Sequence, residues 1–216
     1  MANPARVMEV RDDVIVFDKV VRRTDPYLHI LSPRFYTETF AETLLAWLEN
    51  ESHWSLNESM GYQQYELGFS RFTHCKEIAG LWDGRVLAHI RDGAHRAFGL
   101  PVSGRINISA HKMLPGQQGY IHTDKVPHET HRVVVPLNRG RGADWGGNLV
   151  LLSGSKPADM SVVFKQTSNS AVGFGLGPKS YHAISRVKTG TRFTVIYTFF
   201  SDAVTDLPNP NFFEAS

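Results

Sequence analysis

The chain has 216 residues, enough for one domain with a full hydrophobic core and too few for two catalytic domains. Its 42% hydrophobic and 20% charged residues are typical of a globular protein and exclude a disordered or fibrous chain. A net charge of +2 without long lysine or arginine runs argues against partners such as nucleic acid or a membrane surface. We therefore expect a single domain over residues 1–216.

Cysteine content and the N-terminus indicate where the protein works. The single cysteine, Cys75, excludes an internal disulfide framework and suits a reducing compartment. Residues 1–17 are interrupted by Arg and Asp and lack an apolar core of signal-peptide length. No stretch reaches the roughly 18 apolar residues of a membrane span. We expect a soluble, cytoplasmic protein.

The first half of the chain is predicted to form edge strands and a helical support over about residues 32–100. Residues 14–31 alternate enough for one or two early strands at a sheet edge. Ser32 followed by Pro33 predicts a helix start, and the helix is expected to end near Asn50. A second helix is expected over about 77–98, with Gly99 and Pro101 ending it. The first helix should bury Phe40, Leu44, Trp47 and Leu48 on one face.

The second half, about 104–201, changes to short strands separated by Gly, Pro, Asn and Ser. Eight strands fit a closed antiparallel barrel of the jelly-roll type, so the fold class is mainly β with flanking helices, α+β. Residues 139–147 have the glycine and charge of a mobile loop, and residues 205–216 are typical of a poorly anchored tail. The expected strands are RINISAHKML, GYIHTDK, HRVVVPLN, GNLVLL, MSVVFKQ, SAVGF, YHAISRV and TRFTVIYTFF.

Three residues of these strands form a candidate metal site. His122 and Asp124 are two positions apart, so on a strand both side chains point to one face and can bind one ion. With His182 they supply two imidazoles and one carboxylate, the facial set of non-haem Fe(II) oxygenases, which leaves coordination positions open. The predicted metal and catalytic residues are therefore His122, Asp124 and His182.

The chain has ten histidines, so other ligand sets need to be weighed. His111, His128 and His131 lie near His122 and Asp124 in sequence, and His131 is the serious alternative as a metal ligand. The set with His182 is favoured because only this set places a basic residue, Arg192, ten positions after its last ligand. Arg192 and Thr194 share one strand face, and a guanidinium beside a hydroxyl suits bidentate capture of a carboxylate.

In this order, H-x-D, a distal His and R-x-T, the residues resemble the 2-oxoglutarate-dependent Fe(II) oxygenases, especially the prolyl-hydroxylase-like branch. The resemblance covers about residues 31–201, including LHILSPRFYTETFAETLLAWLE, PGQQGYIHTD and WGGNLVLL. It implies a double-stranded β-helix, a cupin-like jelly roll, that binds Fe(II) and 2-oxoglutarate and uses O2, with ascorbate as reductant in vitro. It also implies that Arg192 and Thr194 bind the far carboxylate of 2-oxoglutarate.

Two further residues are weighed as contacts of the cosubstrate. Tyr120, two before His122, shares the ligand face, although core packing is an equal alternative. Asn107 is a weaker candidate. The family often has a Tyr on the strand before the turn, where this chain has Met113.

The resemblance implies hydroxylation of an unactivated C–H bond, with succinate and CO2 released. The presence of Asp124 argues for oxygenation, because halogenases of this superfamily have a small residue there. We expect a small-molecule substrate, an amino acid or natural-product intermediate, with a peptidyl prolyl-type hydroxylase as the alternative. Arg132 and Lys125 flank the ligands and indicate an anionic group on the substrate. A zinc metallohydrolase and a non-catalytic β-barrel binding module are the rivals from other classes.

Overall fold

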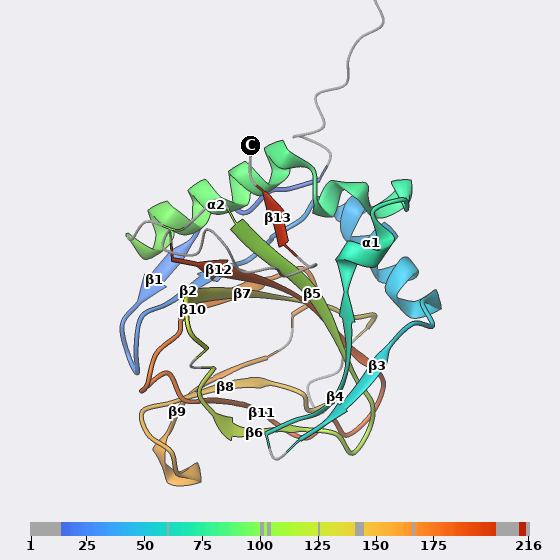
Figure 1. Ribbon diagram of the computed structural model, residues 1–216. Helices are drawn as coiled ribbons and strands as arrows, with labels where there is room; N and C mark the ends of the chain where they lie inside the picture. The colour runs from blue at the N-terminus through green and yellow to red at the C-terminus, as the bar shows by residue number, and fades with distance from the viewer. Residues whose placement is uncertain are drawn as a thin grey trace, which may run out of the picture.

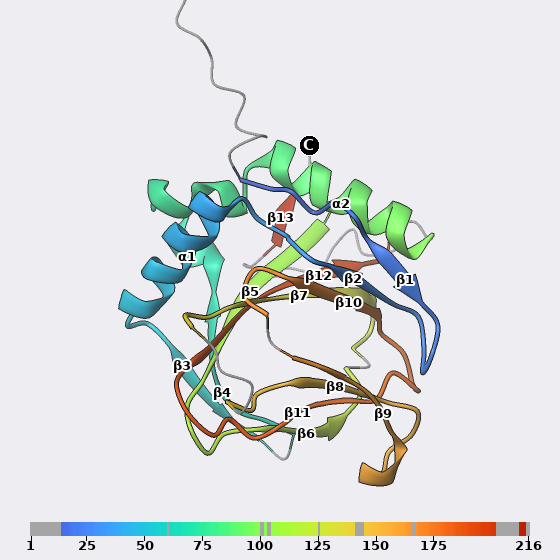
Figure 2. The same ribbon diagram turned by 180° about the vertical axis from the view of Figure 1, so that it is seen from behind.

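The computed structural model describes residues 14–59, 61–99, 102, 105–124, 126–140, 145–165, 167–201 and 212–214. Its elements form three layers (Figure 1). Helices cover the outer face of a large sheet, and a smaller sheet lies against the opposite face of that large sheet (Figure 2). This is the expected mainly β architecture with flanking helices.

The large sheet has nine strands in the order β1-β2-β10-β7-β12-β5-β4-β3, and β13 also pairs with β5. All its pairings are antiparallel. The early strands β1 and β2 lie at one edge, as the sequence predicts. The strands are β1 (Val21–Arg23), β2 (His29–Ser32), β3 (Ser55–Glu58), β4 (Gln63–Gly68), β5 (Arg105–Met113), β7 (Glu129–Leu137), β10 (Ala171–Gly175), β12 (Arg192–Phe200) and β13 (Phe212–Glu214).

The small sheet has four strands in the order β6-β11-β8-β9, again all antiparallel. They are β6 (Gly119–His122), β8 (Leu149–Leu152), β9 (Met160–Phe164) and β11 (His182–Ile184). Together the two sheets contain each of the eight strands predicted for the second half of the chain. A 3₁₀ turn, η3 (Pro157–Asp159), precedes β9.

The first helix begins later than predicted. Helix α1 spans Glu38–Asn50, with Thr37 as its N-cap. Ser32 instead belongs to β2, where it pairs with Ala171, and its hydroxyl donates to the carbonyls of Asp18 and Arg34. Strand pairing therefore uses the residue that local sequence marks as a cap. The end at Asn50 is as expected.

The predicted second helix is two elements. A 3₁₀ helix, η2 (Lys76–Leu81), ends at Trp82, and helix α2 (Gly84–Phe98) begins after it. The break lies at Asp83, whose carboxylate accepts hydrogen bonds from the backbone N–H groups of Arg85 and Val86 at 2.9 and 3.2 Å. This N-cap stabilises a new helix start. Gly99, with φ of 71°, ends α2 as predicted.

Two hydrophobic clusters fill the spaces between the layers. The larger lies between the helices and the large sheet and includes Phe193, Val195 and Tyr197 of β12. The smaller includes Ile196 of the same strand, with Val134, Leu149, Leu151, Val172 and Phe174 from both sheets. Strand β12 is buried along all nine residues because it has a cluster on each face.

Two strand regions were not expected from sequence. Strands β3 and β4 form a hairpin, joined to α2 through η1 (Phe69–Phe72) and η2. The expectation of a poorly anchored tail is wrong for residues 212–214, which form β13 on β5, and the Phe213 ring stacks on Trp82. Residues 205–211 and 215–216 of that tail lie outside the described residues, and so does part of the loop at 141–144. Among the described helices, none has the length and apolar character needed to cross a membrane.

Candidate metal centre and its pocket

Two neighbouring strands of the small sheet bring the predicted ligands together. His122 ends β6, His182 begins β11, and the two residues are direct partners across the pair. Asp124 follows β6 in a turn, where the N–H of Val126 donates to its carbonyl at 2.8 Å. One donor atom from each residue lies within 4.8 Å of the others. The Nε2 atoms of His122 and His182 lie 3.5 and 3.0 Å from the two Asp124 oxygens.

Backbone carbonyls set the tautomer of both imidazoles. Nδ1 of His122 lies 2.6 Å from the carbonyl of Tyr120, and Nδ1 of His182 lies 2.9 Å from the carbonyl of Ser180. A carbonyl only accepts, so each Nδ1 carries a hydrogen, and each Nε2 is the ring nitrogen left to bind a metal ion. Both Nε2 atoms point toward the Asp124 carboxylate.

Asp124 is buried, and both of its oxygens have partners. Oδ1 accepts a hydrogen bond from the hydroxyl of Tyr62 at 2.7 Å, and Oδ2 pairs with the guanidinium of Arg132. Burial alone would raise the pKa of Asp124, but hydrogen bonds from His122 and His182 and the charge of Arg132 lower it well below its usual range. The carboxylate is therefore ionised, as a metal ligand must be.

The donor set fits a divalent first-row metal. Two imidazole nitrogens and one carboxylate oxygen are suited to Fe(II) with open positions, and also to zinc. Within the described residues, these three are the set of His, Cys, Asp and Glu side chains that converge in this way.

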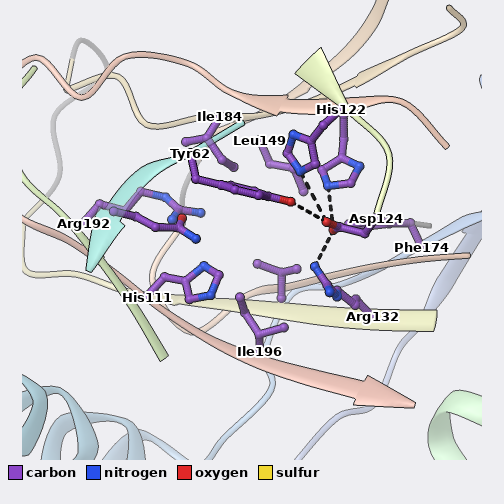
Figure 3. A pocket seen from close by; sticks show the side chains of 13 residues that line it. Tyr62, His111, His122, Asp124, Arg132, Leu149, Phe174, Ile184, Arg192 and Ile196 are labelled. Carbon is purple, nitrogen blue, oxygen red and sulfur yellow. Dashed lines mark hydrogen bonds and ion pairs between the residues drawn. The ribbon is translucent and has the colours of Figure 1, made fainter. Parts of the chain in front are cut away.

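The three residues lie at one end of a pocket between the two sheets (Figure 3). The pocket has a free volume of about 50 Å³, and none of its lining residues is exposed. Apolar side chains from both sheets form its walls, namely Val134, Leu149, Phe174, Ile184 and Ile196. Arg192 and His111 lie at the other end.

Arg192 is buried, with 2% of its surface exposed. Its Nε donates to the carbonyl of Gly147 at 3.0 Å, and Nη1 lies 3.5 Å from the sulfur of Met113. Gly146 and Gly147 have φ of 70° and 64°, and a Cβ on Gly146 would lie 2.0 Å from the carbonyl oxygen of Arg186. The glycine turn therefore brings a backbone acceptor to Arg192.

Thr194 shares the inward face of β12 with Arg192 and Ile196. It is fully buried, and its hydroxyl has no hydrogen-bond partner among the described residues. A buried hydroxyl without a partner is costly, so this atom marks a place where a bound polar group would be stabilised.

His111 of β5 lines the same end of the pocket. Its Nε2 lies 4.0 Å from Glu66 of β4, whose carboxylate accepts from the side chains of Gln64 and Asn57 at 2.8 and 2.9 Å. Burial lowers the pKa of His111 to about 4, and the Arg132 and Arg192 charges contribute in the same direction. His111 is therefore neutral at pH 7.

Two candidate cosubstrate contacts do not line the pocket. Tyr120 is 46% exposed. The pairing of β6 with β11 shifts register by one residue, so Ile184 lies opposite Gly119 instead of Tyr120, and this bulge separates Tyr120 from the face of His122. Asn107 is on the inward face of β5, four residues from His111 and beyond the pocket.

The remaining candidates are placed as follows. His131, the rival ligand, packs against Phe98 of α2 at a ring distance of 4.3 Å, on the helix side of β7 and away from the metal end. Arg132, one residue later, points into the pocket as expected but pairs with both Asp124 and Glu129. Its charge is therefore already balanced. Lys125 lies outside the described residues.

Tyr62 and Gln64 are pocket residues that the sequence interpretation missed. They come from the hairpin β3-β4, whose segments SLNE and QQYELG have polar residues on both faces. The available signal was the spacing of Tyr62, Gln64 and Glu66, which puts three polar groups on one face of a strand.

Solved structures with the same arrangement of strands make the fold recognisable. A prolyl-4-hydroxylase from Pseudomonas putida matches with a TM-score of 0.67 at 12% identity, over 80% of this chain and 91% of that one. The fold is the double-stranded β-helix. A prolyl hydroxylase from Trichoplax adhaerens, in complex with a hypoxia inducible factor peptide fragment, matches with a TM-score of 0.66 at 14% identity, over 83% and 87%.

A 2OG-Fe(II) oxygenase family protein from Burkholderia pseudomallei matches with a TM-score of 0.60 at 17% identity, over 80% of this chain and 85% of that one. No protein-family model and no curated protein sequence matches the chain. At these identities the likeness establishes the double-stranded β-helix, and the chemistry has to be argued from the pocket itself.

Proposed function

We propose that the protein is an Fe(II)- and 2-oxoglutarate-dependent oxygenase that hydroxylates an unactivated C–H bond. The observation that carries this proposal is the combination of two sites in one pocket. A His-Asp-His set lies at one end, and a buried arginine beside a buried hydroxyl without a partner lies at the other. The fold shared with prolyl hydroxylase structures supports it.

Each residue then has a defined task. His122, Asp124 and His182 hold Fe(II) and leave coordination positions open for 2-oxoglutarate and O2. Arg192 binds the far carboxylate of 2-oxoglutarate, with Thr194 as a second donor. The apolar walls exclude water from the space between. Together the bound groups supply an oxidant for C–H hydroxylation, with succinate and CO2 as products.

The test is the formation of succinate from 2-oxoglutarate by the purified protein with Fe(II), O2 and ascorbate. We expect succinate only when metal, 2-oxoglutarate and O2 are all present, and a chelator should abolish it. A protein that binds neither Fe(II) nor 2-oxoglutarate would contradict the proposal.

A zinc metallohydrolase is the rival class, because the same donor set can activate a zinc-bound water. Arg192 argues against it, since a hydrolytic site needs no second, buried cation across an apolar pocket. Loss of succinate formation on replacing Fe(II) by Zn(II), without any hydrolytic activity appearing, would exclude this rival.

For the substrate we favour a small molecule, an amino acid or natural-product intermediate. The pocket has a free volume of about 50 Å³ and no exposed lining residue, which supports a small group near the metal. A peptidyl substrate is the second candidate, since the Trichoplax adhaerens structure contains a peptide fragment. Substrate-stimulated 2-oxoglutarate turnover, compared between free amino acids and short proline-containing peptides, distinguishes them.

The location of the protein in the reducing cytoplasm stays a prediction that is based on the single Cys75.

An anionic substrate also stays a prediction, and its basis in Arg132 is weaker than the sequence indicates. Two carboxylates already balance this guanidinium. The comparison of an acid with its amide as stimulators of 2-oxoglutarate turnover tests the prediction. Equal stimulation would contradict it.

A further inference from the structure

We propose that Tyr62 is a positioning residue of the metal centre, delivered by the hairpin β3-β4, which fixes the orientation of the Asp124 carboxylate. This inference deepens the proposed function and rests on metal binding by His122, Asp124 and His182. No sequence motif pointed to Tyr62, and none of the roles assigned above requires it.

The contacts of Tyr62 are with two of the three ligands. Its hydroxyl donates to Oδ1 of Asp124 at 2.7 Å, and its ring packs edge-on against the imidazole of His122, with ring centroids 4.6 Å apart. Figure 3 shows the phenol extending across the pocket with its oxygen directed at Asp124. One side chain therefore restrains both residues of the H-x-D motif.

Donors on opposite sides hold the carboxylate. Tyr62 bonds Oδ1, whereas Arg132 pairs with Oδ2 and is itself held by Glu129 at 2.8 Å. Rotation of the carboxylate about its Cβ–Cγ bond would break both interactions. The pair of donors thereby directs one oxygen toward each imidazole, at 3.5 Å from His122 Nε2 and 3.0 Å from His182 Nε2.

Backbone bonds fix the position of Tyr62. The residue forms an isolated bridge with Gly119, the first residue of β6. The N–H of Tyr120 donates to the carbonyl of Gly61 at 3.0 Å, and the N–H of Gln63 donates to the carbonyl of Gln118 at 3.2 Å. The hairpin of the large sheet is thus bonded to the strand of the small sheet that carries His122. Tyr62 and the metal ligands cannot move independently.

Outer partners of metal ligands orient them, and their loss typically costs about 10- to 100-fold in metal affinity. We expect Tyr62→Phe to weaken Co(II) binding by about 10-fold, since Arg132 still holds the other oxygen. We also expect a changed visible absorption spectrum of bound Co(II), because loss of the hydrogen bond to Oδ1 allows the carboxylate to change its orientation toward the metal. Co(II) replaces Fe(II) because its spectrum reports coordination number in the absence of turnover.

Tyr120→Phe is the matched control. Tyr120 belongs to the same metal strand but is 46% exposed and does not line the pocket. Its replacement should leave Co(II) affinity and spectrum as in the wild type. Thermal unfolding of the metal-free proteins separates positioning from folding. Tyr62→Phe deletes a single oxygen atom and keeps the ring against His122, so we expect it to unfold near the wild-type temperature.

The outcomes separate this inference from the proposed function. If wild type binds Co(II) and Tyr62→Phe has the same affinity and spectrum, the positioning role is wrong and the metal centre stands. If wild type binds no Co(II) or Fe(II), both fail. A Tyr62→Phe variant that is unfolded without metal, or a Tyr120→Phe variant with the same loss of affinity, would also overturn the positioning role.

Discussion

The two ends of the pocket differ in how completely their polar groups are satisfied. At the metal end, one oxygen of Asp124 accepts a hydrogen bond from Tyr62 and the other pairs with Arg132. The imidazoles of His122 and His182 both donate to backbone carbonyls. At the opposite end, the contacts of Arg192 include the carbonyl of Gly147 and the sulfur of Met113, whereas the Thr194 hydroxyl has no partner among the described residues.

This difference indicates that the ends are prepared for ligands in different ways. The metal end is held in place by contacts that exist before any ion binds, which reduces the cost of ordering its ligands. The other end keeps the Thr194 hydroxyl buried without a partner among the described residues, at a cost to stability that an incoming polar group would recover. The predictions below test each end in turn.

The largest effect is expected from removing a ligand at the metal end. Asp124→Ala or His182→Ala should abolish Fe(II) binding and lower succinate formation by more than about 100-fold, because two ligands cannot hold the facial geometry. His131→Ala is the control and should bind metal as the wild type does, since His131 packs on Phe98. Loss of iron in His131→Ala with retention in His182→Ala would show that the ligand set is wrong. Calorimetric titration with Fe(II) under anaerobic conditions measures the metal affinity of each variant.

At the opposite end, Arg192→Ala should raise the KM for 2-oxoglutarate by about 10- to 100-fold, because a charge-assisted pair contributes about 1.5–3 kcal/mol. Fe(II) affinity should change little. Arg192→Lys should recover part of the loss, as it restores a charge without the planar fork. An unchanged KM in Arg192→Ala would contradict the assignment. Initial rates at varied 2-oxoglutarate concentration measure the KM of each variant.

Acid should destabilise the folded protein, in part through His111 at the Arg192 end of the pocket. Burial lowers the pKa of His111 from 6.5 to about 4, so between these values the unfolded chain binds more protons and stability falls as the pH falls. The loss should be on the order of 2 kcal/mol by pH 4.5. The pKa of Asp124 is lowered, so its contribution persists above its usual value of 3.8 and is lost only at still lower pH.

Urea unfolding of chelator-treated protein at pH 7 and 4.5 measures this effect. His111→Gln should reduce the difference between the two midpoints. His131, which burial also shifts to a pKa of about 4, should account for part of what remains. Equal pH dependence in wild type and His111→Gln would show that His111 does not titrate as inferred.

The smallest effect is expected from the unpaired hydroxyl. Thr194→Val should raise the KM for 2-oxoglutarate by about 3- to 10-fold, the range for loss of one hydrogen bond. The metal-free variant should be as stable as wild type or slightly more so, because a buried hydroxyl without a partner is removed. Thr198→Val, on the same face of β12 but six residues from Arg192 instead of two, should leave the KM unchanged. A KM raised equally by both variants would contradict a specific contact.

The sequence predicted the parts of the site that follow from strand alternation. His122, His182 and Arg192 lie on β6, β11 and β12, and the eight core strands are present as expected. The H-x-D spacing predicted that Asp124 lies beside His122. Asp124 lies just past β6, but the turn keeps its carboxylate beside both imidazoles.

What sequence could not supply depends on tertiary contacts. Tyr62 reaches Asp124 only because the hairpin bonds to Gly119, a residue 57 positions away. A one-residue bulge turns Tyr120 away from the strand face that carries His122, and no local sequence pattern predicts this bulge. Ser32 is a good cap by local preference, and pairing with β10 overrode that preference.

The short strand β13 has a consequence for how the chain can be handled. It pairs with residues 105–107 of β5, whereas β4 pairs with β5 along residues 109–112. Both therefore protect the backbone of β5, and Phe213 covers the face of Trp82. Truncation before residue 212 would leave an open strand edge beside an uncovered indole, which is a known route to aggregation.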